Sequence, residues 1–194
     1  MKKLAASLLC AVCIAPALSA QEFTFGAQAS IALPIGDAGE RIFLNHRPGL
    51  GFGVHGFWNF YPRHVFVPRM DIVLYRRDLG GNALLAPPIK KAFTLKDIKV
   101  GVDYNLVFSN PGIYGIVGLG YSSFDWAIST DDILDRETKG ALYFSLGTGY
   151  KMLEHFLAEL RYTHASYSNV GTSFGYNGKS LTAPAISLSL LWRF

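Results

Sequence analysis

The sequence contains very little cysteine. Its 194 residues include two cysteines, Cys10 and Cys13. Both lie in residues 1–20, MKKLAASLLCAVCIAPALSA, which have a basic start, an apolar centre and small residues at the end. This pattern is typical of a secretory signal peptide, and we expect cleavage after Ala20. The mature chain, residues 21–194, then has no cysteine, which excludes a disulfide framework and thiol chemistry.

Charged residues are also scarce, at 16% of the chain, where about a quarter is usual. Removal of Lys2 and Lys3 with the signal peptide leaves 16 basic and 14 acidic residues, a net charge of +2. This balance is too mild to indicate nucleic acid as a partner. The scattered histidines and the acidic loop DDILDRE (131–137) lack the spacing of a metal site. We therefore expect no metal and no cofactor.

Long hydrophobic runs are missing as well. Half of the residues are hydrophobic, yet no run of about 18 apolar residues follows the signal peptide, which excludes a spanning helix. The hydrophobic residues recur instead at every second position. In KDIKVGVDYNLVF (96–108), for example, apolar side chains alternate with Asp, Lys, Gly and Asn. This alternation is typical of a β-strand that separates two environments.

Eight segments of ten to thirteen residues show the alternation: 22–33, 49–60, 65–77, 96–108, 113–124, 141–151, 156–167 and 185–194. A membrane-spanning β-strand needs about 9–11 residues, and single-chain bacterial barrels have an even number of strands. Long connections such as 78–92 and 125–139 alternate with short ones such as 61–64 and 109–112, as outer loops alternate with periplasmic turns. Lipid offers the backbone no hydrogen bonds, so spanning strands must close into a barrel. We predict an all-β fold, an eight-stranded antiparallel up-and-down transmembrane β-barrel over residues 21–194, in a bacterial outer membrane.

The polar faces of these segments are expected to point into the barrel lumen. An eight-stranded barrel has room inside for side chains only, and an unpaired buried charge costs several kcal/mol. We therefore expect a packed network of ion pairs, with a narrow channel as an alternative. Pro68 lies within segment 65–77 and cannot donate a ladder hydrogen bond, so a bulge or a displaced hydrogen bond is expected there. The predicted lumen residues are Arg69, Asp71, Arg77, Asp97, Lys99, Asp103, Glu159, Arg161 and Arg193.

The chain ends in ISLSLLWRF, with Trp192 and the terminal Phe194 on the apolar face of the last segment. With the eight alternating segments, this ending resembles the OmpA/OmpX-like superfamily of small eight-stranded outer-membrane barrels over the mature chain. The resemblance implies that Phe194 and Trp192 form a signal for the barrel-assembly machinery. It also implies a monomer in contact with outer-membrane lipid and lipopolysaccharide. Its four long outer loops would have a structural or surface-interaction role, with a possible surface ligand.

A second, local resemblance suggests an enzymatic alternative. RYTHASYSNVG (161–171) is similar to the His-x-Ser and Ser-Asn-x-Gly elements of the outer-membrane lipid A deacylases, the PagL family. The likeness implies His164 as the base and Ser166 as the nucleophile, facing lipid near the outer rim. In this chain two residues separate Ser166 from Asn169, and no acidic residue follows Glu159 to orient the histidine. We therefore expect a non-enzymatic protein, with a deacylase-like hydrolase as the alternative hypothesis.

Overall fold

The computed structural model describes most of the predicted mature chain. The described residues are 23–37, 47–79, 91–108, 112–129, 134–168 and 180–194. The predicted signal peptide, residues 1–20, lies outside them. Within the described ranges, no helix is long and apolar enough to cross a membrane.

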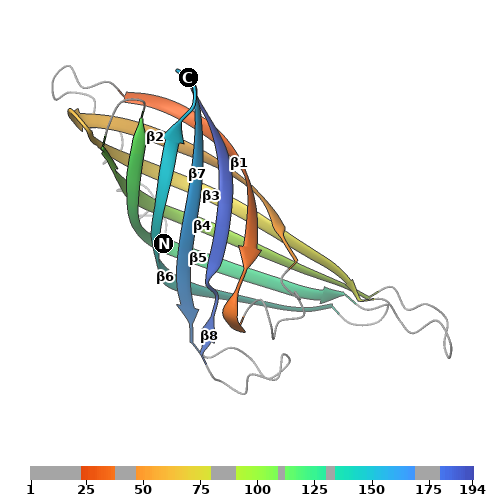
Figure 1. The fold of residues 1–194 in the computed structure, drawn as a ribbon. Coiled ribbons are helices and arrows are strands. Elements are labelled where there is room, and N and C mark those ends of the chain that lie inside the picture. Colours follow the sequence, from red (N-terminus) through yellow and green to blue (C-terminus); the bar gives the residue numbers. More distant parts are fainter. Residues whose placement is uncertain (1–22, 38–46, 80–90, 109–111, 130–133, 169–179) are drawn as a thin grey trace.

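Nine β-strands make up almost all of the described chain. They are β1 (Phe23–Pro34), β2 (Gly49–Tyr61), β3 (His64–Leu79), β4 (Lys91–Val107), β5 (Ile113–Ser129), β6 (Leu134–Lys151), β7 (Phe156–Tyr167), β8 (Leu181–Thr182) and β9 (Ala185–Arg193). Consecutive strands pair antiparallel from β1 to β7. Strand β9 pairs with both β7 and β1, which closes the sheet into the barrel seen in Figure 1.

Strands β8 and β9 are two parts of one transmembrane strand. Ser166 of β7 lies opposite Thr182, and Thr163 lies opposite Ala185, so both parts keep the same register on β7. Between them lies Pro184, which has no backbone N–H to donate. Its carbonyl still accepts a hydrogen bond of 2.8 Å from the N–H group of residue 35 on the other side. Counted in this way, the barrel has eight strands, and the predicted fold class is confirmed.

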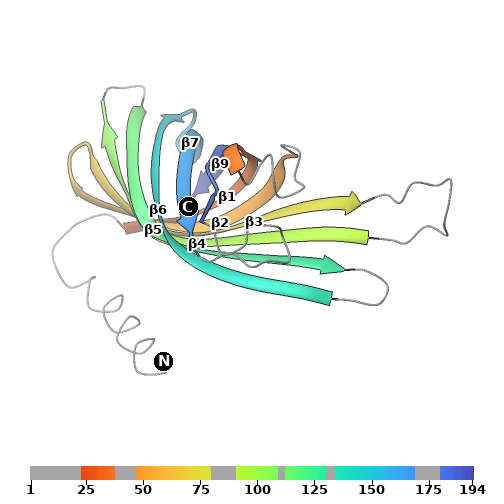
Figure 2. The same ribbon diagram turned by 90° about the horizontal axis from the view of Figure 1, so that it is seen from below.

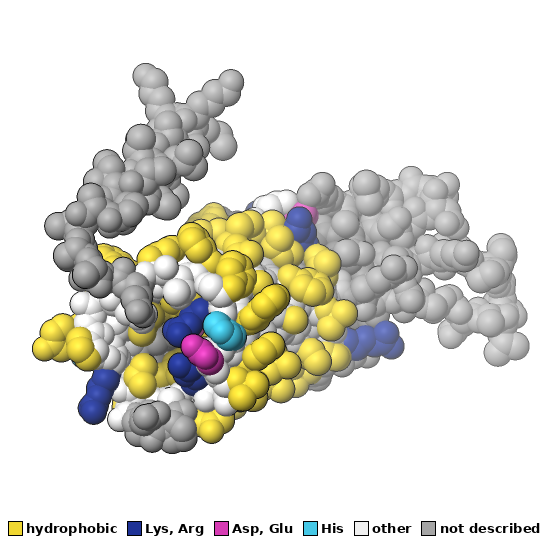
Figure 3. All heavy atoms as spheres, turned by 90° about the horizontal axis from the view of Figure 1, so that it is seen from above, with side chains coloured by type: hydrophobic (Ala, Val, Ile, Leu, Met, Phe, Trp, Pro, Cys, Tyr) yellow, Lys and Arg dark blue, Asp and Glu magenta, His cyan; other side chains and the backbone are white. Residues whose placement is uncertain are grey.

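Side chains alternate between the outer wall and the interior, as a period of two requires. The outward side chains are largely apolar, and Leu119 and Leu142 are 70% and 79% exposed. The inward side chains include Asp103 and Arg161, which are 0% and 4% exposed. Figure 3 shows hydrophobic side chains spread over the outer wall. An apolar exterior around a polar interior is the arrangement expected of a wall that faces lipid.

Four strands extend further than the sequence predicts. The predicted connections 78–92 and 125–139 are too wide, because β4 begins at Lys91 and β6 begins at Leu134. The ladder continues there although the hydrophobic alternation fades, because backbone pairing does not require one apolar face once a sheet leaves lipid. Figure 2 shows β3, β4, β5 and β6 reaching beyond the other strands at the end opposite the C-terminus. We call this extension the tongue.

Pro68 affects the ladder less than the sequence suggests. Opposite Pro68 the pairing between β2 and β3 is interrupted, as expected for a residue without an N–H group. The register nevertheless stays the same on both sides of the interruption, so there is no bulge at this proline. The register shift between these strands lies instead between Asn59 and Tyr61, beside the short turn.

Candidate functional site

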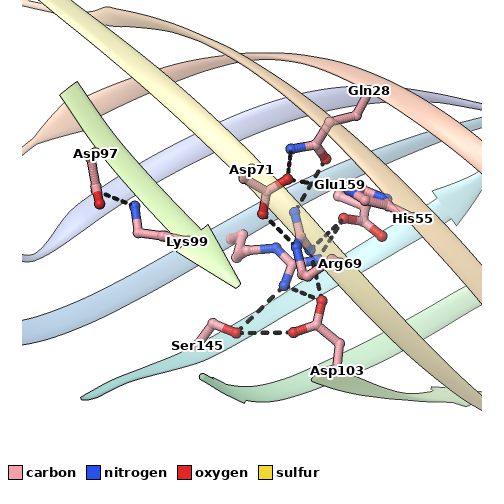
Figure 4. A network of polar contacts seen from close by, with 10 residues as sticks. Gln28, His55, Arg69, Asp71, Asp97, Lys99, Asp103, Ser145 and Glu159 are labelled. Carbon is pink, nitrogen blue, oxygen red and sulfur yellow. Dashed lines mark hydrogen bonds and ion pairs between the residues drawn. The ribbon is translucent and has the colours of Figure 1, made fainter. Parts of the chain in front are cut away.

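The centre of the lumen is held by a carboxylate that bridges two arginines. Asp103 of β4 is fully buried, and its Oδ2 accepts hydrogen bonds from Arg69 Nη1 of β3 at 2.7 Å and Arg161 Nη1 of β7 at 2.6 Å. Ser145 Oγ of β6 donates to the other carboxylate oxygen at 3.4 Å. Figure 4 shows Arg69, Asp103 and Ser145 pointing toward one another from the surrounding wall. Strands from different parts of the barrel are therefore linked through one buried charge.

A second carboxylate extends the network toward β1 and β2. Asp71 Oδ2 accepts a hydrogen bond of 2.6 Å from Arg69 Nε. Its Oδ1 accepts one of 2.8 Å from Gln28 Nε2 and lies 3.2 Å from His55 Nε2. Arg69 also donates to Gln28 Oε1 at 3.3 Å. The Arg69 guanidinium thus bonds to Asp71, Asp103 and Gln28. These hydrogen bonds replace those to water that the group loses on burial.

A third carboxylate continues the network along β7. Arg161 Nη2 donates to Glu159 Oε2 at 2.7 Å, and Tyr114 Oη of β5 donates to Glu159 Oε1 at 2.9 Å. The charges along the lumen therefore alternate in sign from Asp71 through Arg69, Asp103 and Arg161 to Glu159. Alternation places each buried charge beside one of opposite sign, which is the arrangement that limits the cost of burial.

A separate ion pair lies nearer the tongue. Lys99 Nζ is 2.5 Å from Asp97 Oδ2, and Ser122 Oγ donates to Asp97 Oδ1 at 2.5 Å. Ser122 Oγ is also 2.7 Å from Tyr167 Oη. Because the serine uses its only proton on the carboxylate, the tyrosine hydroxyl must donate to the serine oxygen. Figure 4 draws no contact between this pair and Asp103, and among the described residues the pair forms a small network of its own with Ser122 and Tyr167.

Two apolar clusters enclose these polar networks from above and below, a feature that sequence analysis missed. The cluster toward the tongue includes Tyr75, Leu95, Phe124, Tyr143, Tyr167 and Leu181. The cluster toward the chain ends consists of Phe57, Val67, Tyr114, Ile116, Leu157 and Leu191. The sequence signal that could have revealed these clusters is the presence of large apolar or aromatic residues at inward-facing positions near the strand ends. A cavity of about 30 Å³ lies between the networks, and one of about 10 Å³ lies beside the tongue-side cluster; each has room for one or two water molecules at most.

Two of the nine predicted lumen residues do not join these networks in the described structure. The side chain of Arg77 lies outside the described residues, although its backbone belongs to β3. Arg193 is half-buried and lines a cavity at the mouth of the barrel. Its backbone exchanges two hydrogen bonds with His155, of 2.8 and 2.9 Å. The guanidinium forms no ion pair within the described part of the chain.

The structure places His164 and Ser166 on the outward face of β7. Both lie near the C-terminal end of this strand, which is on the tongue side of the barrel. His164 is half-buried, and its Nδ1 lies 3.4 Å from Tyr162 Oη. Its ring packs against Phe144, with ring centroids 5.2 Å apart. Ser166 is exposed, and within the described residues no hydrogen bond joins it to His164. The Ser-Asn-x-Gly element begins at Ser168, and its residues from Asn169 onward lie outside the described residues.

The chain terminus is part of the barrel wall. Phe194 N–H donates to the carbonyl of Phe25 at 2.9 Å, and Phe25 N–H donates to the carbonyl of Phe194 at 3.3 Å. Both Phe194 and Trp192 are more than half exposed on the outer face, where the indole stacks with Phe156 at an interplanar angle of 8°. The last residue therefore contributes to barrel closure between β9 and β1.

A closed eight-stranded barrel with an apolar exterior and an ion-paired interior defines an outer-membrane β-barrel protein. The family model described as the outer membrane protein beta-barrel domain matches residues 5–194. The chain therefore belongs to this family, and the family places it in the bacterial outer membrane. No curated protein matches the sequence.

Solved structures of small outer-membrane barrels are similar in fold. The attachment invasion locus protein Ail of Yersinia pestis, solved with the heparin analogue sucrose octasulfate, has a TM-score of 0.60 at 12% identity, over 91% of this chain and 100% of its own. Neisserial surface protein A has a TM-score of 0.56 at 15% identity, with the same coverage of both chains. The N-terminal β-barrel domain of Pseudomonas aeruginosa OprF has a TM-score of 0.52 at 14% identity, over 90% and 100%. These likenesses establish the fold.

Proposed function

We propose that this protein is a non-enzymatic surface-interaction barrel, and that its β3–β4 hairpin binds an anionic polysaccharide outside the cell. The observation that carries the proposal is the tongue. Beyond Leu74, β3 has no paired residue on β2, and before Tyr143, β6 has no paired residue on β7. The four tongue strands nevertheless remain paired with one another up to their ends. A paired sheet that projects past the membrane wall is a ready platform for binding.

The charge of this hairpin favours an anionic partner. Residues 76–96, RRDLGGNALLAPPIKKAFTLK, contain five basic residues and one acidic residue. The mature chain as a whole is close to neutral, so this segment concentrates its positive charge. Clustered Lys and Arg attract sulfated or phosphorylated sugars by a long-range field that salt weakens.

The orientation of the barrel in the proposal follows from its connections. The turns at 62–63 and 152–155 are short, and both lie at the end of the barrel that carries the C-terminus. Up-and-down outer-membrane barrels place short turns in the periplasm and longer loops outside. The tongue then projects outward. The structural neighbour Ail, crystallised with a sulfated heparin analogue, supports the same class of partner for this chain.

Binding of the purified protein in lipid nanodiscs to immobilised heparin tests the proposal. We expect binding at about 50 mM salt that is lost near 500 mM, because exposed charge pairs are screened. The double variant Arg76→Gln/Arg77→Gln should bind on the order of tenfold more weakly, since each exposed pair contributes up to about 1 kcal/mol. The matched control Arg63→Gln/Lys151→Gln removes two charges at the opposite end and should bind like the unaltered protein. Equal loss in both double variants, or binding insensitive to salt, contradicts the proposal.

The deacylase hypothesis is tested separately on lipid A. Mass spectrometry of lipid A from cells that express the protein should show the full set of acyl chains. This result is expected because His164 bonds to Tyr162 and the chain has no acidic residue on its final strand. Loss of a 3-linked acyl chain that disappears in Ser166→Ala would replace the non-enzymatic proposal with the hydrolase.

A further inference from the structure

A cavity of about 420 Å³ opens at the end of the barrel opposite the tongue. Its volume is in the range of small-molecule sites, which is about 300–1,000 Å³. Phe57, Tyr114 and Leu157 line it and are themselves buried in the apolar cluster below. The cavity is therefore a closed-ended pocket with an apolar floor.

Three cationic side chains from three different parts of the chain line the pocket. They are Arg63 in the turn between β2 and β3, Lys151 at the end of β6 and Arg193 at the end of β9. Within the described chain, none of the three forms an ion pair, and none of the lining residues is acidic. Figure 3, seen from the side of the C-terminus, shows basic side chains gathered with a histidine and an acidic side chain inside a ring of hydrophobic ones. The pocket mouth thus has more basic than acidic side chains, and the three cations that line it form no ion pair within the described chain.

A buried amide in the same pocket also lacks a partner. Asn105 of β4 lines the cavity and is 4% exposed, and its Oδ1 has no hydrogen-bond partner. Leaving such an acceptor unsatisfied destabilises the fold. Buried polar groups without partners are rare enough that each needs a reason. Asn105 Oδ1 is itself closed off from solvent, but the residue lines the pocket, so a turn of the amide group would let an N–H or O–H group of a ligand satisfy this acceptor.

The backbone of Arg63 is an independent observation. Its φ is 74°, in the left-handed region that favours glycine. Pro62 precedes it, and this pair forms the turn that joins Tyr61 to His64. An arginine is strained in this conformation, and backbone strain of this kind concentrates at functional sites. A glycine would make the same turn at lower cost but would bring no charge to the pocket.

We propose that this pocket binds a small amphiphilic anion that carries an N–H donor beside its negative group. The carboxylate would lie among Arg63, Lys151 and Arg193, the N–H would satisfy Asn105 Oδ1, and an apolar side chain would rest on the floor. An N-acylated amino acid and the carboxyl end of a peptide share this chemistry. The proposal concerns the end opposite the tongue and does not depend on the proposed function.

Calorimetric titration of N-acetyl-leucine into the protein in phosphatidylcholine nanodiscs tests the pocket directly. We expect saturable binding in the millimolar range or tighter. N-acetyl-leucinamide, which lacks the charge, and 4-methylpentanoate, which lacks the N–H, should each bind on the order of tenfold more weakly. A peptide such as acetyl-Gly-Gly-Leu distinguishes the sources, because tighter binding of the peptide indicates a peptide end and equal binding indicates a single acylated residue.

Two variants separate the charge from the donor. Arg63→Gly should keep the barrel folded, because it relieves the left-handed backbone, and should weaken N-acetyl-leucine several-fold. Asn105→Leu should remove the preference for N-acetyl-leucine over 4-methylpentanoate. The control Lys96→Gln removes a charge on the tongue side and should leave both affinities unchanged. Absence of saturable binding to the unaltered protein, or a preference that survives Asn105→Leu, overturns the proposal.

Discussion

At the scale of single residues, the buried charges of the lumen are the most consequential feature. Arg69 and Arg161 are both at most 6% exposed, and each bonds to two carboxylates. Such pairs do not stabilise a fold strongly in comparison with apolar side chains of the same volume. They become costly when one member is removed, because the remaining charges are then buried without compensation.

Arg161→Met tests this cost. The change leaves Asp71, Asp103 and Glu159 to share the guanidinium of Arg69, and we expect a loss of about 3–5 kcal/mol in the free energy of unfolding. Urea unfolding in lipid vesicles measures it. The matched control is Arg193→Met, which removes the same side chain at a half-buried position where it forms no ion pair with a described residue, and this variant should change stability by about 0.5 kcal/mol or less. Similar losses in the two variants would show that burial of the arginine stem, and not the charge, decides the effect.

At the scale of elements, the last strand closes the barrel and ends in an aromatic residue. Phe194 pairs through its backbone with Phe25, so the final position completes the ladder between β9 and β1. Its ring is 63% exposed on the outer face and contacts the ring of Trp192 edge-on. An exposed terminal ring has little packing to lose, which fits the predicted role of Phe194 and Trp192 in recognition by the assembly machinery.

Deletion of Phe194 is therefore expected to lower the amount of folded barrel in the outer membrane several-fold in cells. The measurement is heat-modifiable mobility on gels, with folded and unfolded bands compared. The control Tyr61→Ala removes another exposed aromatic at the same end of the barrel and should assemble normally. The assembly role fails if both variants assemble like the parent protein. The purified deletion variant should still refold in detergent. This result would show that the deletion removes the signal for the assembly machinery and not a contact that the folded barrel needs.

At the scale of the whole molecule, the lumen is filled in three layers. An ion-paired middle lies between the apolar cluster on the tongue side and the apolar cluster that forms the floor of the pocket at the opposite end. The cavity of about 30 Å³ in the middle and the one of about 10 Å³ beside the tongue-side cluster are too small to connect the two ends. Eight strands leave no more room than this, since their interior accommodates side chains alone.

Planar bilayer recordings should accordingly show no stepwise conductance for the reconstituted protein. Ions would have to cross two dry clusters in which their hydration cannot be replaced, and this is costly. A matched recording of a porin in the same bilayers establishes that steps can be seen. Reproducible steps from this protein, above those of empty bilayers, would favour the narrow-channel alternative over a closed barrel.

The sequence alone was sufficient for the fold class, because period-two alternation and strand length are local properties of the chain. Segment 96–108 shows why. Asp97, Lys99 and Asp103 are separated by even numbers of residues, so the alternation along a strand already assigned them to one face. The strand ends within the tongue were less predictable. There the sheet has no lipid on one side, so the hydrophobic pattern that marks a strand weakens while backbone pairing continues.

Only the tertiary structure decided which inward residues meet. Asp103, Arg69 and Arg161 lie on three strands, and their distances depend on the stagger of the closed barrel, which no local pattern encodes. For the same reason, the sequence grouped Arg193 with the lumen charges, whereas the stagger places it at the mouth with Lys151. Whether a residue points inward or outward is set by its position along its own strand. Its level along the barrel axis is set by the stagger of all the strands together.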